Sequence, residues 1–325
     1  MLASFWLIQI NDNAASSMRS FPRDLKAAEA DPSPQSHVDV ELSGVCVMLS
    51  RIAYMPLDTY PEAVPEPAVL AAVGFASALG CDLHVSIFSV HIPQLSSPLA
   101  GMLLDGPGLV RSVEEKSKVA ARRLESLVLE AAGTRHKVHC KEREITLGGA
   151  MEAAAHEARH FGLCVLPWPG GTGAAQDLSE AIVFGSGRPT ILVPASVSAT
   201  PVDHIAIAWD GSRLAARALF DALPYLTEGG QITVLTVRDE KPLAGSDIAQ
   251  SLASSLGELG YSARAVSVAI GKASIASALQ DTALSEGAKI MAMGGFGHSR
   301  FRDFILGGAT KGVLTDLRLP ILLSH

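Results

Sequence analysis

Apolar positions in this chain fall into two alternating patterns. Short continuous apolar runs, such as residues 231–237 and 289–293, are typical of strands that are buried on both faces of a sheet. Longer stretches with apolar residues three and four positions apart, such as 67–80 and 273–286, are typical of amphipathic helices. Strands that alternate with helices form parallel sheets covered on both sides. The pattern therefore predicts an α/β protein.

The same order of elements occurs twice along the chain. The first half is expected to contain strands over 44–49, 82–90, 138–145, 163–166 and 189–193 and helices over 67–80, 112–132, 149–160 and 174–184. The second half is expected to contain strands over 204–209, 231–237, 263–269, 289–293 and 320–323 and helices over 212–226, 247–260, 273–286 and 310–316. Both halves close with a helix, a turn, an arginine near a proline and a buried strand. We infer a tandem duplication.

Three segments follow from this division. Residues 1–37 are rich in Ser, Asp, Ala and Pro, so they are expected to be disordered, or to lie upstream of a true start at Met18. Residues 38–195 form the first copy. After a small polar linker, residues 203–325 form the second copy.

Composition limits the kinds of partner and the cellular setting that are expected for the chain. The chain of 325 residues has a net charge of −7 and no long basic run, which argues against a nucleic-acid surface. The four cysteines (Cys46, Cys81, Cys140 and Cys164) are scattered without a CxxC pair, which predicts a reducing, cytoplasmic setting with neither disulfides nor zinc. No uncharged apolar run reaches about 18 residues, so no membrane span is expected.

The strongest candidate for chemistry is a glycine-rich segment in the second copy. Gly294-Gly295-Phe296-Gly297 is followed, after nine residues, by Gly307-Gly308. The segment lies between a predicted strand and a predicted helix, where glycines let the backbone approach an anion and free helix N–H groups point at it. Its spacing fits neither a Walker A loop nor the dinucleotide fingerprint. The alternative is a tight turn without a ligand.

These residues resemble the universal stress protein family. Its nucleotide-binding members carry G-x-x-G, nine residues and then G-[S/T], and Gly294, Gly297 and Gly307 match the three glycines. Asp210 matches an aspartate that follows the family's first strand. The resemblance covers the second half by motif and the first half by strand order alone. It implies two tandem, doubly wound, five-stranded parallel sheets of the Rossmann-like, adenine nucleotide alpha hydrolase-like type.

The resemblance also implies a binding site for ATP or another adenine nucleotide, with or without Mg²⁺. In such relatives the aspartate contacts the adenosine part, the end of the second strand lies beside the base, and the glycine loop holds ribose and phosphates. The corresponding site residues are Ala208, Trp209, Asp210, Val237, Met293, Gly294, Gly297, His298, Gly307, Gly308 and Ala309. Gly308 departs from the family's Ser or Thr, which removes a hydrogen bond worth about 0.5–1.5 kcal/mol.

Several of these residues have a second interpretation. Asp210 also fits the N-cap of the helix that follows it, and Trp209 could pack in the core instead of stacking on a base. His298 is expected to make a polar loop contact and not to act in catalysis. Arg300 and Arg302 flank the loop and face either phosphate or solvent. The first copy lacks the loop, and Ser50-Arg51 follow its predicted first strand, so it is expected to be a degenerate copy that does not bind nucleotide.

No catalytic constellation and no metal-ligand set stands out in the sequence. The chain is therefore expected to be a nucleotide-binding regulatory protein of the stress response. The last strands, 190–193 and 321–323, are expected to pair and join the copies as an internal pseudo-dimer, and a further homodimer is left open. Two alternatives compete: an interaction scaffold that binds no nucleotide, and a slow ATPase or adenine-nucleotide hydrolase.

Overall fold

The computed structural model describes residues 51–93, 106–134, 136–170, 173–237, 247–270, 273–295 and 308–325. The predicted strand 44–49 and segment 1–37 lie outside these residues. So do Gly297, His298, Arg300, Arg302 and Gly307 of the glycine-rich loop.

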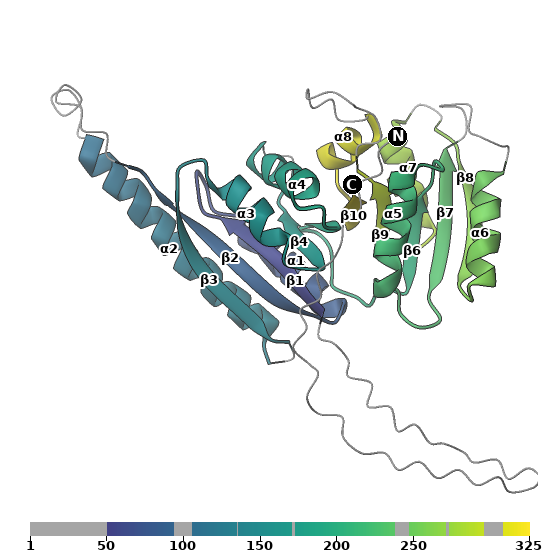
Figure 1. The fold of residues 1–325 in the computed structure, drawn as a ribbon, viewed down its shortest axis with the longest axis horizontal. Helices are drawn as coiled ribbons and strands as arrows, with labels where there is room; N and C mark the ends of the chain where they lie inside the picture. The colour runs from purple at the N-terminus through teal and green to yellow at the C-terminus, as the bar shows by residue number, and fades with distance from the viewer. Residues whose placement is uncertain are drawn as a thin grey trace, which may run out of the picture. The chain divides into compact units, whose positions relative to one another are not determined.

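The first half alternates strands and helices as the sequence predicts (Figure 1). Its elements are β1 (Arg51–Asp58), α1 (Glu66–Ala78), β2 (Cys81–His91), α2 (Gly106–Ala132), β3 (Val138–Thr146), α3 (Ala150–Ala158), β4 (Leu163–Trp168), α4 (Gly173–Ser186) and β5 (Thr190–Pro194).

The second half repeats this order within two or three residues of the expected bounds, although the first helix is shorter than predicted. Its elements are β6 (His204–Ala208), α5 (Arg213–Ala222), a short 3₁₀ turn (Leu223–Tyr225), β7 (Gln231–Val237), α6 (Ile248–Glu258), β8 (Ser262–Val268), α7 (Ile275–Ser285), β9 (Ile290–Gly294), α8 (Gly308–Thr315) and β10 (Ile321–Ser324). Pro224 ends α5 early because proline cannot donate the next helical hydrogen bond.

The ten strands of the described residues belong to one sheet with the order β3-β2-β1-β4-β5-β10-β9-β6-β7-β8. Within each half the neighbouring strands pair in parallel, as predicted. The two halves meet where β5 and β10 pair antiparallel, with Ile321 opposite Leu192 and Leu323 opposite Thr190. The predicted pairing of the last strands is therefore present, and it joins the two five-stranded sheets into one.

Apolar side chains cover both faces of this sheet. Successive residues of β6 divide between the faces, with Ile205 and Ile207 in one core cluster and Ala206 in the other. Helices α1, α2, α5 and α6 contribute to the first cluster, and α3, α4, α7 and α8 to the second. The two halves thus share two continuous core layers, which is the doubly wound arrangement expected from the sequence. None of the described helices is long and apolar enough to cross a membrane.

The first strand lies later in the chain than predicted. Strand β1 begins at Arg51, pairs with β2 along its whole length, and pairs with β4 at Ala53 and Tyr54. The prediction that Arg51 follows the first strand is therefore wrong, while Ser50 lies outside the described residues. Arg51 and Pro56 interrupt the apolar run, so the pattern of apolar residues does not predict a strand here. Pro56 is accommodated because it lies beyond the residues that pair with β4, where a missing N–H breaks no ladder bond on that side.

Candidate functional site

Strand order reverses inside the second half between β6 and β9. The chain passes from β6 to β7 on one side, while β9 and β10 lie on the other. Open parallel sheets bind ligands at the carboxyl ends of the strands beside such a reversal. Val237 and Gly294 end β7 and β9, and Asp210 lies two residues beyond the end of β6. These sequence-predicted candidates therefore come from the strand ends that this rule selects.

A tight turn holds Asp210 between β6 and α5. The Trp209 N–H donates to the Leu235 carbonyl at 2.8 Å, which continues the ladder to β7 past the end of the strand. Gly211 then adopts φ +75°, a conformation that favours glycine. Oδ1 of Asp210 accepts a hydrogen bond from the Ser212 N–H at 2.9 Å, and the side chain is exposed.

The N-cap of α5 is Ser212, whose Oγ accepts from the Ala215 N–H at 3.1 Å. The interpretation of Asp210 as the N-cap is therefore wrong. Its carboxylate instead closes a side-chain turn two residues before the helix, as aspartates commonly do. The carboxylate is left accessible from the edge of the sheet.

The candidate residues of the strand ends divide between the two faces of the sheet. Ala208, Val237 and Met293 pack on the cluster that includes α7 and α8. Trp209 packs on the opposite cluster, and its indole N–H is buried without a partner among the described residues. Of its two interpretations, the structure therefore supports core packing for Trp209. An apolar surface beside a bound base can come from the other three residues.

Gly294 has a packing role of its own. A Cβ at this position would lie 2.7 Å from Cβ of Leu214, 2.8 Å from its carbonyl carbon and 2.9 Å from the Ala215 nitrogen. The absence of a side chain therefore allows the start of α5 to approach the end of β9. Gly295 donates its N–H to the Ser324 carbonyl at 2.8 Å, which extends the pairing of β9 with β10 by one step.

The far end of the glycine-rich loop is the start of α8. This helix begins at Gly308, two residues earlier than predicted, so Gly308 and Ala309 belong to its first turn. The first N–H groups of a helix have no intrahelical acceptor and can bind an anion. Thr310 is buried and so belongs to the packed side of the helix.

The structure also reveals Asp58, a candidate residue that the sequence interpretation missed, and the strand pairings of the two halves show where it lies. Tyr54 lies opposite Cys164, which lies opposite Thr190, the residue after Pro189. In the second half Ala206 lies opposite Met291, which lies opposite Ile321, the residue after Pro320.

Tyr54 and Ala206 therefore hold the same place in the two halves, and four residues further on Asp58 corresponds to Asp210. Pro189 and Pro320 each precede the last strand of a half, and alignment of these two prolines, followed through the paired strands, is the signal that could have found Asp58.

Comparison with known proteins agrees with the fold. The universal stress protein family model matches residues 201–325. A universal stress protein from Archaeoglobus fulgidus DSM 4304 superimposes with a TM-score of 0.60 at 17% identity, over 83% of this chain and 97% of that one. A search of the curated proteins found no matching relative.

Two further solved structures resemble the chain more weakly. A putative universal stress protein from Pseudomonas aeruginosa UCBPP-PA14 has a TM-score of 0.45 at 13% identity, over 85% of this chain and 93% of that one. A universal stress protein in complex with cAMP has a TM-score of 0.29 at 19% identity, over 44% of this chain and 98% of that one.

The Archaeoglobus structure covers both halves of the chain, which shows the fold, and the family model covers the half that carries the glycine motif. Residues 201–325 match the universal stress protein family model, so this second half is a universal stress protein domain.

Proposed function

We propose that the second domain, residues 203–325, binds ATP or another adenine nucleotide at the carboxyl ends of β6, β7 and β9, and that the protein acts as a cytoplasmic nucleotide-binding regulator in the stress response. The observation that carries this proposal is the reversal of strand order between β6 and β9. The exposed carboxylate of Asp210 follows β6, and α8 begins beyond the loop that follows β9.

Each part of a nucleotide has a candidate partner in this arrangement. The Asp210 carboxylate accepts hydrogen bonds from the adenosine part, because one turn contact at Oδ1 leaves acceptor capacity on the group. Ala208, Val237 and Met293 supply an apolar surface for the base.

The phosphates are assigned to the glycine-rich loop with Gly297, His298 and Gly307, and to the N–H groups of Gly308 and Ala309 in the first turn of α8. Mg²⁺ would accompany a di- or triphosphate through the phosphate oxygens.

Titration calorimetry with ATP tests this proposal on the full chain. Saturable binding is expected, and Asp210→Ala should weaken it about tenfold because a charge-assisted hydrogen bond is lost. Asp210→Asn keeps an oxygen acceptor for the Ser212 N–H but removes the charge, so a loss of about fivefold is expected. The pair of variants separates the ligand contact from the turn contact. Gly297→Val should abolish binding while the thermal transition remains.

Other outcomes favour the alternatives. If the folded protein shows no saturable binding at millimolar ATP, the proposal fails and the interaction scaffold is favoured. Steady release of phosphate or pyrophosphate that disappears in Gly297→Val would indicate the ATPase or hydrolase alternative.

A further inference from the structure

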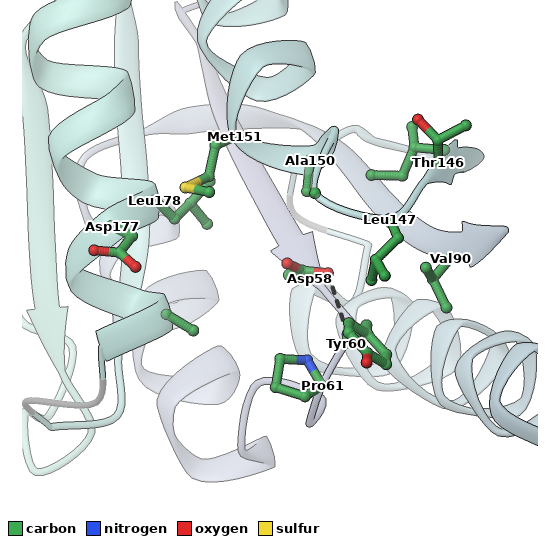
Figure 2. Close-up of a pocket in the computed structure, with 13 residues that line it drawn as sticks. Asp58, Tyr60, Pro61, Val90, Thr146, Leu147, Ala150, Met151, Asp177 and Leu178 are labelled. Atoms are coloured by element: carbon green, nitrogen blue, oxygen red, sulfur yellow. Dashed lines mark hydrogen bonds between the residues drawn. The ribbon is translucent and has the colours of Figure 1, made fainter. Parts of the chain in front are cut away.

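A pocket opens in the first half at the place that corresponds to the proposed nucleotide site. Asp58, the counterpart of Asp210, lies in its wall (Figure 2). The cavity measures about 230 Å³ and is lined by residues from the ends of β1, β2 and β3, from α3 and α4, and from the turns between them. Pockets that bind drug-sized ligands measure roughly 300–1,000 Å³. This pocket therefore suits a smaller molecule.

Most of the lining is apolar. Val90 and Leu147 lie on one side of Asp58, and Met151 and Leu178 lie on the other (Figure 2). Leu147 is 50% exposed and Met151 is 39% exposed, although both are large apolar side chains. Exposed apolar side chains that line a cavity are typical of a surface that a ligand covers.

The charged groups of this pocket are acidic. Oδ1 of Asp58 accepts from the N–H groups of Thr59 at 2.8 Å and Tyr60 at 3.2 Å. Burial raises the pKa of the Asp58 carboxyl above its usual value, in spite of these two hydrogen bonds. Asp177 adds a second carboxylate from α4. None of the described residues that line the pocket is Lys, Arg or His, and no ion pair of the described residues includes Asp58.

Glu157, another carboxylate of the first half, differs from Asp58 because it has a cationic partner. Glu157 is enclosed by Arg143, Tyr54 and Ser86, which donate hydrogen bonds to it. When a carboxylate is partly desolvated and no cation lies beside it, the solvation that its charge loses is not fully replaced. A positively charged ligand group would supply the missing partner. A phosphate would instead meet two carboxylates of its own sign.

We propose that the first half binds a small amphipathic amine, with its ammonium group against Asp58 and its apolar body between Leu147, Met151 and Leu178. The first copy has then exchanged ligand chemistry and has not lost its site. The inference goes beyond the proposed nucleotide binding, because it rests on a different half of the chain and holds whether or not ATP binds.

Three probes of similar shape test the proposal on the full chain. Phenethylamine, 2-phenylethanol and 3-phenylpropionate share a phenyl group and differ in charge. In ligand-observed NMR titrations phenethylamine is expected to bind with millimolar affinity, at least about tenfold more tightly than 3-phenylpropionate, with 2-phenylethanol between them.

Asp58→Asn should reduce phenethylamine affinity about tenfold while it keeps an oxygen for the Thr59 and Tyr60 N–H groups. Glu258→Gln is the matched control, because it removes one exposed carboxylate from α6 in the other half and should change nothing. Leu147→Lys supplies a second test at an exposed position, because an added ammonium group in the lining should reduce the preference for phenethylamine over 3-phenylpropionate.

Several results would overturn the proposal: no binding of phenethylamine, equal binding of all three probes, or unchanged affinity in a folded Asp58→Asn protein. Displacement of phenethylamine by saturating ATP would also overturn it, because the probe would then be reporting the nucleotide site. Failure of ATP to bind would contradict the proposed function and leave this inference standing.

Discussion

Gly294→Ala is expected to lower the free energy of unfolding by about 3 kcal/mol, because the new methyl group has no space. Its contacts at 2.8 Å and 2.9 Å are with backbone atoms of Leu214 and Ala215, which cannot move unless the start of α5 moves as a whole. With an entropy of unfolding of about 2.1 cal/mol/K per residue, the expected fall in Tm for a chain of this size is about 4–5 °C. Chemical denaturation followed by circular dichroism measures the effect.

Gly295→Ala is the matched control next in the chain. A Cβ there would have its nearest contact at 3.4 Å, with Cγ1 of Val183, which is an ordinary van der Waals distance. We expect a loss below about 1 kcal/mol. Equal destabilisation by the two substitutions would show that α5 does not press on the end of β9 as described. Because α5 follows the Asp210 turn directly, Gly294→Ala should also weaken ATP binding.

Glu157→Ala is expected to destabilise the first half by about 3 kcal/mol. The carboxylate accepts from Tyr54 Oη at 3.0 Å, from Ser86 Oγ at 2.7 Å and from the Arg143 guanidinium at 3.0 Å. Tyr54 and Ser86 are fully buried. Loss of their acceptor leaves two buried hydroxyls unsatisfied, at about 1–3 kcal/mol each, with partial relief if water enters. Denaturant unfolding at pH 7 measures the loss.

The same residue predicts how stability depends on pH. Burial opposes the charge of Glu157, but the hydrogen bonds from Ser86 and Tyr54 and the nearby Arg143 outweigh it and hold the pKa of this carboxyl below its usual value. A depressed pKa in the folded state gives stability that is present above the unfolded pKa, about 4.5, and is lost as the pH falls through the folded value.

Glu157→Gln isolates this contribution. The glutamine keeps an oxygen acceptor and cannot ionise, so the variant should lose about 1–2 kcal/mol at pH 7 and should lose less additional stability than the natural protein as the pH falls below about 4.5. Parallel pH profiles for the two proteins would contradict the assigned role of Glu157.

Local pattern was sufficient to predict the alternation of strands and helices, because most strands are unbroken apolar runs. It failed at β1, where Arg51 and Pro56 interrupt the apolar run and where only the pairing partners explain why Pro56 is tolerated. The packing role of Gly294 was equally inaccessible, because it depends on the approach of α5 from a distant part of the sequence. Contacts between elements, unlike the elements themselves, leave no local periodicity.

The candidate site shows the same division. Its strand-end residues could be found from the motif, and the two-residue period of β6 could have assigned Trp209 and Ala208 to opposite faces. The competition between Asp210 and Ser212 for the N-cap could not be decided from sequence, since both residue types cap helices well. Asp58 was missed because an error in one strand moved the expected strand end by several residues.

The antiparallel pairing of β5 with β10 has a consequence for how the two halves communicate. The strands within each half are parallel, and the two halves run in opposite directions. The carboxyl ends of the strands in one half therefore lie at the same side of the sheet as the amino ends of the strands in the other half. Asp58 and Asp210 therefore lie at opposite ends of the sheet's strands, and a single small molecule cannot bridge them. Any coupling between an amine in the first half and a nucleotide in the second would have to pass along the backbone hydrogen bonds and side-chain packing of the shared sheet.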